Sequence, residues 1–291
     1  MVTAEILSQS MPPFLIMFRE ALEAALIVGI IYAYLQKIER KDVTPYLIFG
    51  VLSAVVVSLA AGFSLNYYFG GLSGASEKMF EGIASITATV VLTYMIFWMA
   101  KNARNIKSTM ETKIQTSLSK GYLFGITSLA FVAVVREGIE TVLFMTALVS
   151  TNTYSTFIGI TLGIISVLII SILMMRGIRR LNMQKFFKYT SLLLVIFAAG
   201  LFGYGIHELI EAGEILNITF GVLSQPAYNI NPADISNPFH EKGVIGSILK
   251  ALVGYDGNPE WLRVIGYIGY WVGIGAYLLR SYGSKMKISK L

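Results

Sequence analysis

Long apolar segments dominate this sequence and leave few folds open to it. Seven windows of about 20 residues are apolar enough to cross the hydrocarbon of a lipid bilayer. They are residues 13–35, 45–69, 79–100, 121–149, 156–175, 188–211 and 264–280. Only 14% of the 291 residues are charged, compared with roughly 25% in soluble domains. The sequence therefore predicts an all-α polytopic membrane protein with seven transmembrane helices.

The distribution of lysine and arginine predicts the orientation of these helices. Segments 36–44, 101–120, 176–188 and 280–291 hold 17 of the 23 basic residues. Because cytoplasmic loops retain positive charge, these segments are expected inside, with the amino terminus outside (N-out, C-in). The same bias accounts for the pI of about 9.3. No basic stretch is interleaved with aromatic residues, so nucleic-acid binding is not indicated.

Two of the apolar windows contain the same pattern of charges. The first contains Arg19–Glu23 (REALE) and the fourth contains Arg136–Glu140 (REGIE). An ionised side chain inside the hydrocarbon costs about 2.5 kcal/mol or more, so it is expected to be functional. Four glutamates against two arginines leave a formal charge of −2, which a bound multivalent cation would balance. A structural alternative is that each motif is a buried ion pair that sets helix register, although register needs only one carboxylate per arginine.

Helical spacing assigns different roles to the glutamates of each motif. Residues three or four apart share a helix face. Arg19 is therefore expected to pair with Glu23, and Arg136 with Glu140. Glu20 and its counterpart Glu137 are left as the freer metal ligands.

The spacing of the two motifs predicts an inverted repeat. Three predicted segments make up each interval, and an odd number inverts the second copy relative to the first. In transporters built this way the site lies near the midplane, where the repeats face each other. The organisation expected is one membrane domain over 1–291, consisting of repeat one (1–105), repeat two (118–213), an outer loop (212–263) and a seventh helix (264–280).

Four features of the connections and helices have non-catalytic interpretations. The outer loop is rich in proline and asparagine, which break helices, and it is interpreted as a tether in preference to a lid, with a short helix near 244–253. The polar segment 101–120 is expected to form a surface helix. Trp98, Trp261, Trp271 and Tyr282 are interpreted as interfacial anchors. Glycine pairs spaced four apart predict close helix packing, and these are Gly121 with Gly125, Gly159 with Gly163, and Gly269 with Gly273.

A second acidic group is expected near the outer ends of segments three and six. Glu77 and Glu81 open segment three, and His207, Glu208 and Glu211 close segment six. Glu77 is also well explained as a hydrated surface acid. Carboxylates suit hard cations, and one imidazole extends the choice to iron and other transition metals. The chain has no cysteine, so thiolate sites and disulfides are excluded.

The residues resemble the oxidase-dependent iron permease family, which includes the fungal ferric-iron permeases and the bacterial EfeU-type permeases. The resemblance covers nearly the whole chain. It rests on the two R-E-x-L-E-type motifs, of which the second has Ile139 in place of leucine, and on two further stretches. These stretches are Glu81-Gly82 running to Leu92-Thr93-Tyr94-Met95-Ile96-Phe97-Trp98-Met99, and His207-Glu208-Leu209 with Glu211-Ala212-Gly213.

This resemblance implies a multi-pass permease of the cell membrane that imports Fe³⁺. The expected metal ligands are Glu20, Glu23, Glu137, Glu140, Glu81, His207, Glu208 and Glu211, with Arg19 and Arg136 as supporting ion pairs. The resemblance implies no permanently bound cofactor; the expected partners are the iron ion, the lipid bilayer and a separate ferroxidase or iron-delivery protein outside. A transporter of another multivalent metal, such as manganese or lead, is the main alternative. A di-iron oxidoreductase is less favoured, because neither His207 nor His240 completes the Glu-x-x-His pattern of such centres.

Overall fold

The computed structural model describes residues 2–102, 106–119, 123–149, 153–175, 183–234, 237–241 and 243–288. Helices make up most of these residues, and the pairing between strands is limited to an isolated bridge between Pro226 and Glu260 among the residues described. The α-helices are α1 (Val2–Lys37), α2 (Thr44–Phe69), α3 (Ala75–Asn102), α4 (Ile106–Ser119), α5 (Leu123–Val149), α6 (Thr153–Met175), α7 (Met183–Ile215), α8 (Val244–Val253) and α9 (Trp261–Ile288).

Each of the seven predicted segments coincides with a helix, and the all-α prediction is confirmed. The two additional helices suggested by the sequence also form, as α4 and α8. Most of these helices are longer than the apolar windows: α1 begins at Val2 and not at residue 13, and α9 continues to Ile288 and not to residue 280. Hydropathy marks only the apolar part of a helix, whereas backbone hydrogen bonding continues into the polar flanks.

Within the described ranges, four helical segments are long and apolar enough to cross a membrane. They are Lys41–Phe69, Ala75–Met99, Thr153–Met174 and Tyr189–Ile215. Helices α1 and α5 each carry the three charged residues of a motif, and α9 is rich in glycine and tyrosine. Length and composition of the described residues alone therefore do not establish the predicted count of seven.

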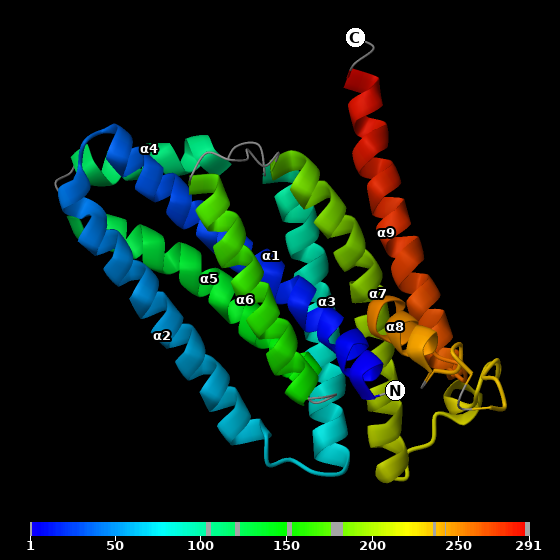
Figure 1. The fold of residues 1–291 in the computed structure, drawn as a ribbon. Coiled ribbons are helices and arrows are strands. Elements are labelled where there is room, and N and C mark those ends of the chain that lie inside the picture. Colours follow the sequence, from blue (N-terminus) through cyan, green and yellow to red (C-terminus); the bar gives the residue numbers. More distant parts are fainter. Residues whose placement is uncertain are drawn as a thin grey trace. The chain divides into compact units, whose positions relative to one another are not determined.

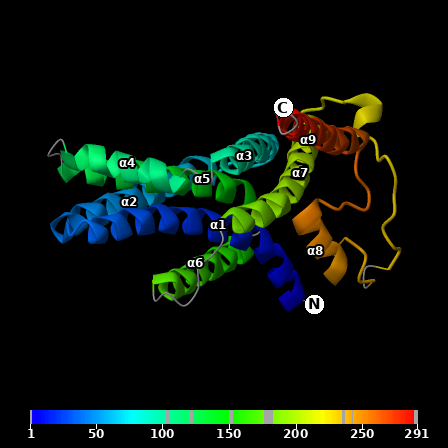
Figure 2. The ribbon, with the colours of Figure 1, turned by 90° about the horizontal axis from the view of Figure 1, so that it is seen from above.

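The described residues form two compact units. The first, called here the motif unit, contains residues 2–72 and 91–194, and the second, called the α9 unit, contains residues 73–90 and 195–288. In the motif unit α1 packs along α6, and α2 packs along α5 (Figures 1 and 2). Both views show α1 and α5 running in opposite directions. The two helices that carry the charged motifs are therefore antiparallel neighbours in one unit.

A cluster of buried apolar side chains joins α1, α2, α4 and α5 in the motif unit. Ile31 and Leu35 of α1 pack with Leu47 of α2 and Ile126 of α5, and all four are buried. Ile114 of the polar helix α4 is also fully buried in this cluster. The segment 101–120 thus contains a helix, as predicted, and Ile114 packs this helix against the apolar cluster.

Glycines permit the close approach of helices in the motif unit. A Cβ at Gly159 would lie 2.8 Å from the Phe14 backbone nitrogen, and one at Gly163 would lie 2.9 Å from the Met17 Cβ. Both contacts join α6 to α1, so this predicted packing is confirmed. The prediction is wrong for Gly269 and Gly273 of α9, which have nothing within 4 Å of the added carbon. Gly121 lies outside the described residues.

Substituting Gly159 by alanine should therefore destabilise the protein. The new methyl group meets backbone atoms of α1, which cannot rotate away, and overpacking of this kind costs about 1–3 kcal/mol. The measurement is the thermal unfolding midpoint of the purified protein in detergent. Gly269→Ala is the matched control and should leave the midpoint unchanged or raise it slightly, because alanine is the better helix former. Equal midpoints for Gly159→Ala and wild type would contradict the close packing of α1 and α6.

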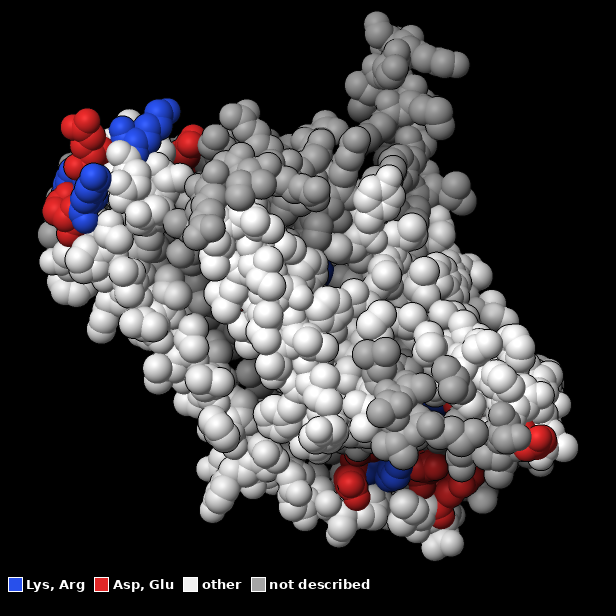
Figure 3. Space-filling model, in the orientation of Figure 1, with Lys and Arg blue, Asp and Glu red and all other residues white. Residues whose placement is uncertain are grey.

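Apolar side chains cover the outward faces of α2 and α6. Phe49, Val56 and Phe63 of α2 are exposed, as are Phe157 and Leu168 of α6. Neither helix contains a charged residue, and both lie in the white region of the surface in Figure 3. Helices that are apolar on every side are typical of membrane spans, so these faces suit contact with lipid.

In the α9 unit, the first part of α3 packs against the last part of α7. A Cβ at Gly82 would lie 2.6 Å from the Leu209 Cγ, and one at Gly205 would lie 2.9 Å from the Ile86 Cγ1. The two helices therefore approach closely without large side chains between them. This packing brings the acidic ends of the two helices together.

Part of the segment after α7 packs against that helix, and the interpretation of this outer loop as a tether stays a prediction. Gly254, which ends α8 with a φ of +74°, packs against Gly200, where a Cβ would lie 2.7 Å from the Gly254 nitrogen. Further along, the backbone pairs across the loop at Pro226 and Glu260, and Ala227 donates to the Pro259 carbonyl at 2.8 Å. Composition predicted a helix-breaking segment, but these long-range contacts are not visible in composition.

Candidate metal centres

Arg19 on α1 pairs with both glutamates of its own motif. Its Nη1 donates to the Glu20 Oε1 at 2.7 Å, and its Nη2 lies 2.7 Å from the Glu23 Oε1. The three side chains are almost completely buried, with Arg19 only 1% exposed. The predicted pair with Glu23 is confirmed, but the prediction that Glu20 is freer than Glu23 is wrong, because both carboxylates lie 2.7 Å from the guanidinium. The guanidinium fork presents several donors, so one arginine serves two carboxylates.

Arg136 on α5 is paired differently from Arg19. Its Nε donates to the Glu140 Oε1 at 3.0 Å, as predicted, and lies 3.7 Å from the Glu137 Oε1. The Arg136 side chain is 40% exposed, whereas Glu137 is buried. The second motif therefore leaves Glu137 less completely neutralised than Glu20.

The glutamates of the two motifs converge, as predicted. Glu20, Glu23 and Glu137 each offer a carboxylate oxygen, and these three atoms lie within 4.8 Å of one another. Oε2 of Glu20 and Oε2 of Glu137 are buried without a hydrogen-bond partner. A buried oxygen without a partner is costly, and a cation placed between these carboxylates would relieve that cost. Glu140 is close to Arg136 but does not belong to this group of three.

Helix α3 supplies neighbours to both arginines that the sequence did not single out for this role. Arg19 lies 3.1 Å from the Met95 sulfur, and the Arg136 guanidinium lies over the ring of Trp98, 4.6 Å from its centroid. Trp98 therefore has a specific partner, and its interpretation as an interfacial anchor stays a prediction. Arginine stacked on tryptophan is held by a cation–π interaction. The three-residue spacing of Met95 and Trp98 within α3 was the available signal.

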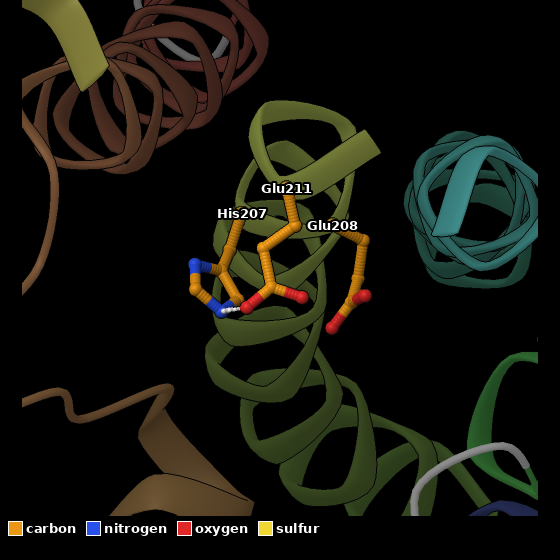
Figure 4. Close-up of side chains that lie close together, drawn as sticks. All are labelled: His207, Glu208 and Glu211. Carbon is orange, nitrogen blue, oxygen red and sulfur yellow. Dashed lines mark ion pairs between the residues drawn. The ribbon is translucent and has the colours of Figure 1, made fainter. Parts of the chain in front are cut away.

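The second candidate centre is in the α9 unit, at the end of α7. His207, Glu208 and Glu211 place one ligand atom each within 4.8 Å of one another, and Figure 4 shows their side chains grouped along one side of the helix. His207 Nε2 lies 3.4 Å from the Glu211 Oε1. Glu208 is buried, whereas Glu211 and His207 are partly exposed. The three predicted ligands on this helix are thus brought together.

Lys78 on α3 joins this group as its cation. Its Nζ lies 2.8 Å from both the Glu208 Oε2 and the Glu211 Oε2, and 3.9 Å from the Glu81 Oε2. Glu81 is buried and accepts a hydrogen bond from the Tyr204 hydroxyl at 3.4 Å. The charged atoms along the lower edge of Figure 3 show acidic and basic groups mixed on one face. Glu77 is exposed, as expected of a hydrated acid.

Glu260, just before α9, fixes the orientation of His207. The Glu260 Oε1 lies 2.7 Å from the His207 Nδ1. Burial is the largest single effect on Glu260 and opposes its ionisation, but the hydrogen bond and the charge of His207, a backbone hydrogen bond and the charge of Arg263 together hold the pKa of Glu260 below its usual value. Because an ionised carboxylate only accepts, Nδ1 carries the proton and Nε2 is left to face Glu211. A carboxylate behind a histidine is the usual support for a metal-binding imidazole.

Lys78, Tyr204 and Glu260 were missed as parts of this centre. The three-residue spacing of Lys78 and Glu81 was a local signal for the lysine. Tyr204 precedes His207 by one helical turn, which gave it a place on the same helix. Glu260 gave no signal, because it reaches His207 only through the fold of the loop.

Comparison with known proteins identifies the family. The model of the iron permease FTR1 family matches residues 10–280. An uncharacterized protein of Archaeoglobus fulgidus is 37% identical over 273 residues, which cover 94% of this chain and 96% of that protein. The ferrous iron permease EfeU of Yersinia pestis is 33% identical over 266 residues, covering 89% and 90%. No solved structure matches the chain significantly. The chain therefore belongs to the FTR1 family of iron permeases.

Proposed function

We propose that this protein imports ferric iron across the cytoplasmic membrane through the converging glutamates of α1 and α5. Membership of an iron permease family supports iron transport across a membrane and a transporter in preference to an enzyme. The observation that carries the site is the convergence of Glu20, Glu23 and Glu137 in a buried position. The two motifs hold four carboxylates against two guanidinium groups, so a multivalent cation improves the charge balance. Protons compete with the metal for the same oxygens.

In this proposal the protein crosses the membrane seven times, and helices α1–α3 and α5–α7 form an inverted repeat. The amino terminus lies outside and the carboxyl terminus inside, which places 17 of the 23 basic residues in cytoplasmic segments. Helix packing supports the repeat. Exchanging the two repeats replaces α1 by α5 and α6 by α2, so the pair α1–α6 becomes the pair α5–α2. Both pairs are the main contacts of the motif unit. In this arrangement iron first meets Glu81, His207, Glu208 and Glu211 on the outer side and then the motif glutamates.

Ferric iron is the cargo that suits the ligands best. Carboxylate oxygens are hard donors, and a cation of high charge gains most from a site with excess negative charge. The relatives from Yersinia pestis and Escherichia coli strain 536 are named ferrous iron permeases. Both descriptions are compatible if a separate ferroxidase or iron-delivery protein outside the membrane presents iron to the permease. Iron is cargo in this scheme, and the permease holds no permanent cofactor.

Uptake of radioactive iron into proteoliposomes tests this function. Wild type is offered iron as a ferric citrate complex or as anaerobic Fe²⁺, with manganese as the competing metal and protein-free liposomes as the blank. We expect ferric iron to accumulate fastest. Glu20→Gln should slow uptake strongly, because it removes a buried ligand at nearly constant size. Preferential uptake of manganese would show that manganese, and not iron, is the cargo. Unchanged iron uptake by Glu20→Gln would show that this glutamate is not part of the pathway.

A further inference from the structure

Lys78 forms ion pairs with two of the carboxylates that a metal at the α7 centre would use. Its ammonium nitrogen lies 2.8 Å from one oxygen each of Glu208 and Glu211. Those carboxylates belong to the group with His207 whose ligand atoms lie within 4.8 Å of one another. A transition metal binds carboxylate oxygens at about 2 Å. An ammonium and a metal ion on the same two carboxylates would repel each other at close range, so they compete for this negative charge and binding of one favours release of the other.

The surroundings of Lys78 leave it able to move. It lies in the first turn of α3, its side chain is 30% exposed, and its four-carbon stem is flexible. The packing of α3 on α7 relies on Gly82 and Gly205, whose missing side chains bring the helices together. Lys78 is therefore not needed as a clamp between these helices. Its ion pairs lie at the edge of the α3–α7 contact, which the packing at Gly82 and Gly205 maintains without them.

We infer that Lys78 is a tethered cation that fills the carboxylate site on α7 until a multivalent metal displaces it. This inference rests on the proposed binding of metal by His207, Glu208 and Glu211. Coulomb attraction grows with the charge of the ion, so a monovalent ion gains no more from these carboxylates than the lysine already does. A metal of charge two or three gains more and replaces the ammonium. Lys78 thus neutralises the empty site and selects for multivalent cations.

Metal binding to Lys78 variants tests the inference. Mn²⁺ is titrated into the full-length protein, and free Mn²⁺ is measured by electron paramagnetic resonance. All proteins carry Glu20→Gln and Glu137→Gln, which remove the motif ligands. We expect Lys78→Met to bind Mn²⁺ about tenfold more tightly, because two ion pairs no longer compete. Lys78→Arg should restore competition, and Lys250→Met, which removes an exposed lysine of α8, should bind as the Lys78 protein does.

A second measurement uses the wild-type protein and does not depend on the folding of a variant. Acetylation of each lysine by a soluble reagent is followed by mass spectrometry with and without saturating Mn²⁺. Displacement should raise the labelling of Lys78 several-fold while the exposed Lys250 stays constant. Unchanged labelling, or equal or weaker binding by Lys78→Met, would overturn the inference. Absence of Mn²⁺ binding in every variant would remove the α7 site and this inference with it, while iron uptake through the motif glutamates would still stand.

Discussion

Replacing Arg19 by methionine is expected to cause a large loss of stability. The substitution keeps an apolar stem of similar length but leaves Glu20 and Glu23 buried without their guanidinium partner. Breaking a buried ion pair from one side costs about 3–5 kcal/mol. The measurement is the unfolding midpoint and the monodisperse yield of the purified protein in detergent.

Arg136→Met is the matched comparison for this prediction. The Arg136 side chain is 40% exposed and pairs at hydrogen-bonding distance only with Glu140 among the motif carboxylates. Its loss should cost about 1–2 kcal/mol, including the interaction with Trp98. Adding Glu20→Gln to Arg19→Met should recover part of the stability, because one uncompensated charge is removed. Equal losses for the two arginine variants would contradict the asymmetry between the motifs.

Substituting Glu137 by glutamine is expected to reduce iron uptake by about 100-fold or more, with little change in folding. Glu137 is buried, its nearest arginine nitrogen is 3.7 Å away, and its Oε2 has no hydrogen-bond partner. Glutamine preserves the shape but removes the negative charge, and one lost charge-assisted ligand is worth about 3 kcal/mol, which corresponds to this factor. The initial rate of radioactive iron uptake into proteoliposomes measures the effect.

Two controls separate a transport defect from a folding defect in this experiment. Glu39→Gln changes an exposed glutamate just after α1 and should transport iron at the wild-type rate. The unfolding midpoint of Glu137→Gln should stay at or above that of wild type, because a buried charge has been removed. Wild-type uptake by Glu137→Gln would show that this glutamate does not bind the cargo.

The helices and the meeting of the two motifs followed from local patterns in the sequence. Apolar windows gave the helices because hydropathy is a property of consecutive residues, and the repeated motif gave the convergence of Glu20 with Glu137. The pairing of Arg19 with two carboxylates did not follow, since it depends on how one guanidinium is oriented in a packed interior. Helical spacing alone offers Glu23 and gives no reason to include Glu20.

The α7 centre shows the same division. His207, Glu208 and Glu211 lie within five residues on one helix, and that spacing was enough to group them. Lys78 comes from another helix and Glu260 from a loop, and only tertiary contacts bring them to the group. Charged partners from distant segments determine the electrostatics of such a centre. A ligand list predicted from local spacing in the sequence therefore lacks these partners.

The contacts of α3 with the two motif arginines have a mechanical consequence. Met95 touches Arg19 and Trp98 lies against Arg136, and these two residues are less than one helical turn apart on α3. Any sliding or rotation of this part of α3 against α1 and α5 changes the surroundings of both guanidinium groups at once. The two halves of the glutamate site are thereby linked through a third helix, and a single rigid-body shift would alter them in concert.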